Sequence, residues 1–284
     1  MDTRWLVALS LAVTIGFAFV LGRAPRPRAP QEPPLFVRAA SVPPGPGPVP
    51  ACELPPAVCK ARCDELVPFA PASGPGYVDV PVKGEESAAT STSYVRRDLM
   101  MRVQYAAAKV ACVAAGWQTG NGGPIALGDM SEVDGRPPGS RTGRPRHMTG
   151  SHTRGRDIDL AYFQRATGDN QIRPICDHTI DGVKQYRCLG EPTTLDSWRT
   201  ALLIGALMEE PGIRVIGIDG KAAPAIEAAL RQLCRDHWLP RSACERGRLQ
   251  YELQDEGRGW YHAHHHHLHV SWDPTVTGTG TGVQ

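Results

Sequence analysis

Three segments of the chain carry apolar residues at helical spacing. Residues 94–115 repeat them every three or four positions and end at Gly116, which predicts an amphipathic helix. Residues 195–208 and 222–233 are also predicted as helices, and Pro211-Gly212 ends the first of these two. The apolar positions of the first helix are Leu99, Val103, Ala106, Val110 and Val113.

Shorter segments carry the pattern of strands. Residues 157–163 alternate between polar and apolar side chains, which is typical of a strand with two different faces. Because helices and strands follow one another without a regular β-α-β rhythm, we expect an α+β fold with a small antiparallel sheet flanked by helices. The four predicted strands are residues 124–127, 157–163, 213–218 and 267–272.

The segment 132–150 shows neither pattern. It is rich in Gly, Pro and Arg, so we expect a long loop. Ordered loops of this length inside a domain are often functional.

The N-terminus differs from the rest of the chain. Arg4 precedes an apolar, uncharged run over residues 5–22, which is typical of a signal peptide or an uncleaved membrane anchor. Gly22 suits cleavage, whereas the arginines that follow at once argue against it, so both alternatives stay open. In either case we expect an exported, periplasmic protein, tethered to the inner membrane through residues 5–22 if they are retained.

A proline-rich tract follows this segment. Residues 23–56 are dominated by Pro, Ala and Arg and include PPGPGPVP. Such a sequence cannot form the interior of a helix or strand, and it predicts an extended spacer. We therefore divide the chain into a signal peptide or anchor (1–22), a linker (23–56) and a folded domain (57–284).

Cysteine content agrees with export. An even number of cysteines in an exported chain predicts disulfides. Cys176 with Cys188 and Cys234 with Cys244 would each close a short loop, and Cys112 would then pair with one of the N-terminal three. The absence of paired Cys-x-x-Cys motifs disfavours a zinc–cysteine site. The eight cysteines are Cys52, Cys59, Cys63, Cys112, Cys176, Cys188, Cys234 and Cys244.

The charge balance argues against a nucleic-acid partner. The chain has 31 Lys and Arg against 29 Asp and Glu, for a net charge of +2. Its arginines are scattered and no basic helix stands out, so we expect no nucleic-acid binding.

Candidate chemistry is concentrated in two short windows, residues 151–159 and 262–270. His267 and His269 lie two apart on a predicted strand, so both side chains point to the same face. Asp157 and Asp159 do the same on another strand. Imidazole and carboxylate are common zinc ligands, and three of them with one open position make a catalytic site. Spacing alone leaves open which of the four are ligands.

The histidine run also has simpler interpretations. It could be a solvent-exposed tract that buffers metal ions. A histidine near a carboxylate could equally be a buried structural pair. The presence of both windows in one chain favours a metal site over either interpretation.

Together these motifs resemble the penicillin-insensitive murein endopeptidase family, a group of LAS-type zinc peptidases. The resemblance covers roughly residues 94–272 and depends on the order of three motifs. These motifs are Gly128-Asp129-Met130-Ser131, Ser151-His152-x-x-Gly155-x-Asp157-Ile158-Asp159-Leu160 and His264-x-x-His267-x-His269-Val270.

The resemblance implies both a site and an activity. It implies that His152, Asp159 and His269 bind one Zn²⁺ ion and that His267 and His264 are catalytic. It further implies an LAS/DD-peptidase-like fold and hydrolysis of peptidoglycan cross-links between D-alanine and meso-diaminopimelate.

The chain departs from the family pattern near the first motif histidine. Family members often have a second histidine three residues earlier, where this chain has Thr149, with His147 displaced by two positions. Thr153 also replaces the usual Gln. Two alternatives therefore stay open: a carboxypeptidase or amidase of the same group, and a peptidoglycan-binding protein without catalysis.

Overall fold

A computed structural model of the chain describes residues 49–80, 92–148, 150–246, 249–273 and 275. The predicted signal peptide or anchor, and residues 23–48 of the predicted linker, lie outside the described residues. Among the helices of the described part, none is both long enough and apolar enough to span a bilayer.

A seven-stranded mixed sheet forms the centre of the described part. Its strands are β2 (Ser73–Gly74), β3 (Tyr77–Asp79), β5 (Ile125–Leu127), β6 (Asp157–Ala161), β9 (Ile213–Gly217), β10 (Leu249–Gln250) and β11 (His267–Trp272). They are ordered β10-β9-β11-β6-β5-β3-β2. The prediction of a small antiparallel sheet is therefore only partly right, because β10 with β9 and β3 with β5 are parallel pairs.

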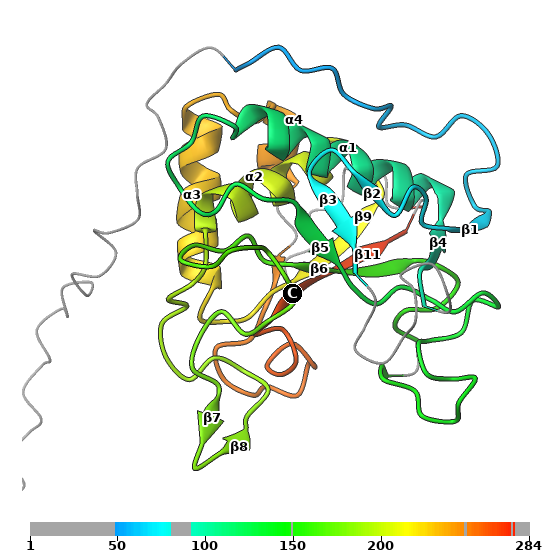
Figure 1. Cartoon of the computed structure of the whole chain (residues 1–284), viewed down its shortest axis with the longest axis vertical. Helices are drawn as coiled ribbons and strands as arrows, with labels where there is room; N and C mark the ends of the chain where they lie inside the picture. The colour runs from blue at the N-terminus through cyan, green and yellow to red at the C-terminus, as the bar shows by residue number, and fades with distance from the viewer. Residues whose placement is uncertain (1–48, 81–91, 149, 247–248, 274, 276–284) are drawn as a thin grey trace, which may run out of the picture. The chain divides into compact units, whose positions relative to one another are not determined.

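The helices pack on one face of this sheet (Figure 1). The three predicted helices are confirmed, and the core lies between them and the sheet. The first begins later than predicted, because residues 94–96 form β4, which pairs with β1 (Leu66–Pro68). The helices are α1 (Arg97–Val113), α2 (Ser197–Leu207), α3 (Ala223–Arg235) and α4 (Arg241–Glu245).

The two central strands set up the functional face. β6 and β11 are antiparallel neighbours, and His269 is the register partner of Asp159. The intervening residues Ile158, Leu268 and Val270 are fully buried in the core. Because side chains alternate along a strand, the acidic residues of β6 and the histidines of β11 all face away from the helices.

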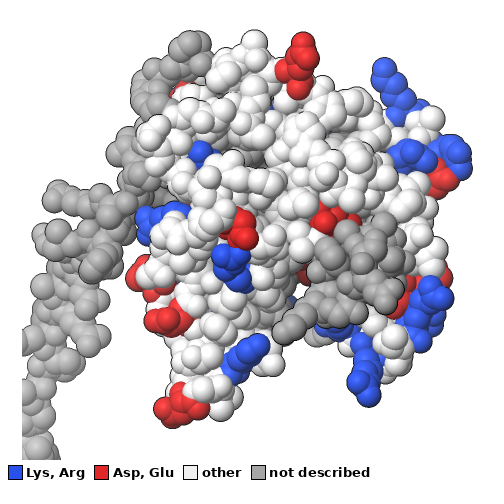
Figure 2. Space-filling model, viewed as in Figure 1, with Lys and Arg blue, Asp and Glu red and all other residues white. Residues whose placement is uncertain are grey.

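Loops cover the face of the sheet that the helices leave free. None of the described residues in 132–150 belongs to a helix or strand, which confirms the predicted long loop. A hairpin of β7 (Thr179–Ile180) and β8 (Val183–Lys184) extends from the same side (Figure 1). On the face seen in Figure 2, positive and negative side chains are interspersed.

All eight cysteines form disulfides: Cys52–Cys112, Cys59–Cys63, Cys176–Cys188 and Cys234–Cys244. The two predicted short loops are confirmed, and Cys112 has one of the three N-terminal partners expected for it. Cys52 thereby attaches the end of the proline-rich tract to α1. Four disulfides indicate an oxidising compartment, as expected for an exported protein.

The Cys52–Cys112 disulfide should stabilise the fold more than Cys59–Cys63. The two bonds span 60 and 4 residues, and a longer closed loop restricts the unfolded chain more. In the chain-entropy model the two contributions are ~4 and ~2 kcal/mol. We expect these losses in the free energy of unfolding when each pair is replaced by serine, measured by denaturant titration. Equal losses would contradict the prediction.

Candidate metal centre

Three atoms of ligand type face one another where β6 meets β11. Oδ1 of Asp159 lies 3.2 Å from Nε2 of His152 and 3.1 Å from Nδ1 of His269. The two nitrogens are 3.2 Å apart. A tetrahedral zinc ion with bonds of ~2.0–2.1 Å separates its ligands by roughly 3.3 Å. This triangle of His152, Asp159 and His269 therefore has the size that such an ion requires.

Hydrogen bonds determine which nitrogen each histidine has free. Nδ1 of His152 lies 3.1 Å from the carbonyl oxygen of Met130. A carbonyl only accepts, so Nδ1 donates and Nε2 keeps its lone pair. Nε2 of His269 lies 3.3 Å from Oδ1 of Asp157, and its Nδ1 lies 3.1 Å from Oδ1 of Asp159. With Nε2 donating to Asp157, a metal ion can take the place of the proton on Nδ1, so both rings turn a possible ligand nitrogen toward the triangle.

A tight turn presents His152 to the strands. Its backbone φ is +52°, a conformation that residues other than glycine rarely adopt. Gly155, three residues on, has a φ of +67°, and a Cβ there would lie 2.5 Å from the backbone nitrogen of Arg96. The glycine of the His-x-x-Gly motif is therefore required by this close approach of two backbones.

Asp157 supports the site from outside the triangle. Its Oδ1 accepts a hydrogen bond from Oγ of Ser271 at 2.6 Å, and Ser271 in turn accepts one from Nη2 of Arg214 at 2.7 Å. Spacing alone left Asp157 open as a ligand. The geometry instead makes it the carboxylate that orients His269, a partner that ligating histidines commonly have.

Replacing Asp157 with asparagine should weaken metal binding without removing a ligand. We expect the Kd for zinc to rise by ~10–100-fold, because a neutral amide replaces the charged carboxylate that orients His269. Competition with a fluorescent chelator measures this Kd. Asp169→Asn, at an exposed position, is the control and should leave the Kd unchanged. An unchanged Kd in Asp157→Asn would show that the negative charge of this partner is not needed.

The buried charges of the site depend on one another. Burial raises the pKa of the Asp159 carboxyl, but the nearby His267 and His152 outweigh it and hold the pKa well below its usual value. Burial likewise opposes the His269 imidazolium, yet hydrogen bonds to Asp157 and Asp159 raise the pKa of His269 to about 9. Because His269 is then protonated near neutral pH, metal binding at its Nδ1 would release a proton.

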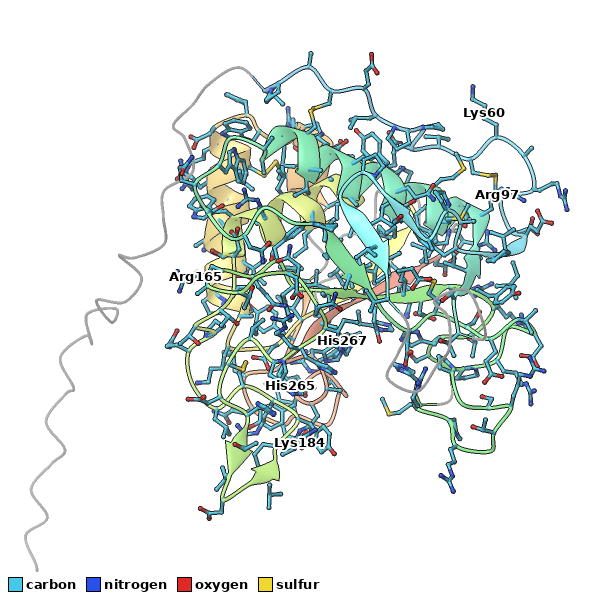
Figure 3. All side chains as sticks on the ribbon, in the orientation of Figure 1. Lys60, Arg97, Arg165, Lys184, His265 and His267 are labelled. Atoms are coloured by element: carbon cyan, nitrogen blue, oxygen red, sulfur yellow. A yellow bond between two sulfur atoms is a disulfide. The ribbon has the colours of Figure 1, made fainter. Side chains whose placement is uncertain are left out.

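The two predicted catalytic histidines lie beside the triangle. Nε2 of His267 is 3.4 Å from Oδ1 of Asp159. The ring of His264 lies 5.4 Å from that of His267 and 6.3 Å from that of His269, between centroids. Burial lowers the pKa of His264 to about 4. The structure therefore brings all five predicted site residues together, and Figure 3 shows His267 on the side of the sheet away from the helices.

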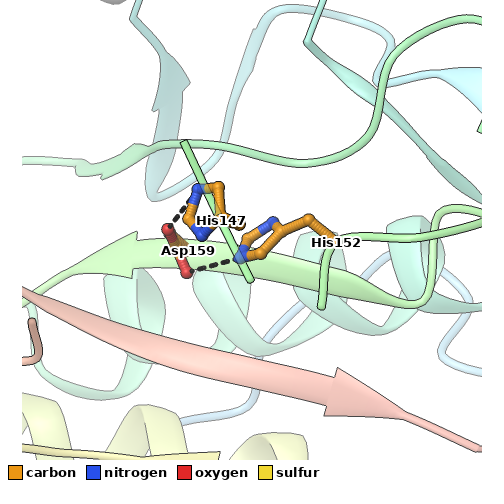
Figure 4. Close-up of side chains that lie close together, drawn as sticks. All are labelled: His147, His152 and Asp159. Carbon is orange, nitrogen blue, oxygen red and sulfur yellow. Dashed lines mark ion pairs between the residues drawn. The ribbon is translucent and has the colours of Figure 1, made fainter. Parts of the chain in front are cut away.

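His147 also lies at the site, although the sequence motifs give it no role. Its ring stacks on His152 with centroids 3.8 Å apart, and its Nε2 lies 2.7 Å from Asp129 and 3.9 Å from Asp159. His147, His152 and Asp159 offer atoms that all lie within 4.8 Å of one another, a group that could hold a metal ion (Figure 4). Two sequence signals point to His147: its place in the long loop, which folds back over β6, and its position two residues before the point where the motif pattern often has a second histidine.

The remaining histidines of the run differ from each other. His265 is buried, its ring stacks near that of His178 with centroids 5.1 Å apart, and burial lowers its pKa to about 3. His266 instead touches His267, with 3.2 Å between their Nδ1 atoms. The ring of His266 therefore contacts a predicted catalytic residue, whereas the ring of His265 lies near His178.

These features define a mixed α/β protein with a buried His/Asp centre that could hold a metal ion. No family model matches the chain, and no curated protein matches it.

Proposed function

We propose that the chain is an exported zinc peptidase that hydrolyses amide bonds in the peptide cross-links of peptidoglycan. The observation that supports this most is the triangle of His152, Asp159 and His269 with His267 beside it. The order of the sequence motifs suggests the substrate, with the bond between D-alanine and meso-diaminopimelate as the expected target.

The donor set suits zinc in a catalytic role. Two imidazole nitrogens and one carboxylate oxygen are a common set for catalytic zinc, which keeps a further position for water or substrate. Structural zinc sites more often use four protein ligands, frequently cysteines. Here every cysteine is in a disulfide, so none is available as a thiolate ligand.

Each histidine of the site has a distinct part in this proposal. When bound, zinc would supply a Lewis acid that polarises the scissile carbonyl and lowers the pKa of water to ~7. His267 reaches the same space with Nε2, where it accepts the proton of the attacking water and returns it to the leaving amine. His264, whose ring centroid lies 5.4 Å from that of His267, donates a hydrogen bond to the carbonyl oxygen as negative charge develops.

Digestion of purified muropeptides tests the proposal. The purified chain with zinc should convert cross-linked dimers to monomers, seen by mass spectrometry. A chelator should stop the reaction, zinc should restore it, and penicillin should not inhibit it, because the proposed mechanism uses no serine nucleophile. Release of terminal D-alanine would instead indicate a carboxypeptidase, and release of whole peptides an amidase. Binding to peptidoglycan without any cleavage would indicate a binding protein.

A further inference from the structure

The indole of Trp260 borders one side of the metal centre. Its ring centroid lies 5.3 Å from that of His264 and 6.2 Å from that of His269. The side chain is half-buried, so part of the indole packs on the protein and part of its surface stays open.

Gly217 makes room for this indole. A Cβ at position 217 would lie 2.3 Å from Cζ3 of Trp260 and 3.1 Å from Nε2 of His264. Gly217 is also the register partner of His269 across β9 and β11. Because Gly217 has no side chain, the indole can lie against β9 next to His269, a predicted ligand.

A buried carboxylate fixes the loop that carries Trp260. Oε2 of Glu252 accepts a hydrogen bond from the backbone N–H of Trp260 at 2.6 Å. Its Oε1 accepts from the backbone N–H groups of Glu256 at 2.8 Å and Arg258 at 3.2 Å. The side chain of Glu252 is 0% exposed, and a buried carboxylate is tolerated only where such bonds are made. These bonds tie the backbone at residues 256, 258 and 260 to one buried side chain.

We propose that Trp260 binds substrate at this centre and that Glu252 is the residue that positions it. The inference rests on the proposed peptidase function. The indole packs against the small apolar side chain next to the scissile bond, of the size of an alanine methyl group. The face of an indole is a flat apolar surface, so it packs well against an apolar side chain.

Three variants test this role against a matched control. Trp260→Ala should raise KM for a cross-linked muropeptide ~10-fold, with kcat and the zinc Kd nearly unchanged, because the lost contact is made in the bound state. Trp260→Phe should have an intermediate effect. Glu252→Gln should also raise KM, because its amide can keep Oε1 for Glu256 and Arg258 but turns an NH2 group toward the N–H of Trp260. Glu191→Gln, at an exposed position outside this loop, should leave KM unchanged.

Several results would overturn the inference. One is a wild-type KM in Trp260→Ala, and another is a zinc Kd that weakens in step with KM, which would give the indole a purely structural role. If thermal denaturation shows that Trp260→Ala does not fold, Trp260→Phe and Glu252→Gln decide in the same way.

A failure of the proposed function would be recognised separately. If the wild-type chain cleaves no muropeptide, calorimetric titration with the same intact dimer replaces the kinetic assay. Weaker binding to Trp260→Phe and Glu252→Gln than to wild type supports the inference. Equal binding, or no binding by the wild type, overturns it.

Discussion

His269→Ala should lose tight zinc binding, whereas His147→Ala should keep it. His269 Nδ1 closes a triangle with edges of 3.1–3.2 Å to the other two predicted ligands. Without it only two of the three ligands remain, too few for a stable catalytic site. Metal analysis after zinc reconstitution and gel filtration should give one zinc per wild-type chain and close to none for His269→Ala.

His147 provides the sharpest comparison because it also belongs to a group that could hold a metal ion. Its Nε2 already pairs with Asp129 at 2.7 Å and lies 3.9 Å from the nearest oxygen of Asp159, so we expect it to contribute little to affinity. If His147→Ala loses zinc and His269→Ala keeps it, the ion is held by His147, His152 and Asp159 instead.

His267→Ala should lower kcat by ~10²–10⁴-fold while zinc content stays nearly unchanged. This range is the usual contribution of a positioned acid–base group. KM should change less than kcat, because the proton transfers occur in the transition state. Steady-state cleavage of a muropeptide dimer, with metal analysis of the same preparations, measures both quantities.

His265→Ala is the control for this variant. His265 sits two residues from His267, but its ring lies near that of His178 rather than among the predicted ligands. Its replacement should leave kcat within about threefold of wild type, well below the loss expected for an acid–base group. Loss of zinc from His267→Ala would show that His267 is itself a ligand.

The sequence predicted the central strand pair well. β6 and β11 are long enough to show alternation, and their polar residues fall at every second position between fully buried apolar ones. This pattern leaves one arrangement in which the core is apolar, with Asp159 and His269 on the same face. The structure has this arrangement.

Other parts could not be predicted because their cause is not local. β2 and β10 are two residues long, too short for any periodicity, and they exist only because a neighbouring strand pairs with them. The stacking of His147 on His152 depends on the path of an irregular loop. The orienting role of Asp157 depends on register with β11, since its partners His269 and Ser271 are more than 110 residues away.

The separation of the predicted ligands along the chain links metal binding to folding. Asp159 and His269 are 110 positions apart and meet only because β6 pairs with β11. An ion held between them would act as a reversible cross-link in the middle of the sheet, one that the unfolded chain cannot form. Each tenfold increase of free zinc above Kd would then add ~1.4 kcal/mol to the free energy of unfolding. The melting temperature of this domain should therefore rise with the concentration of free zinc around it.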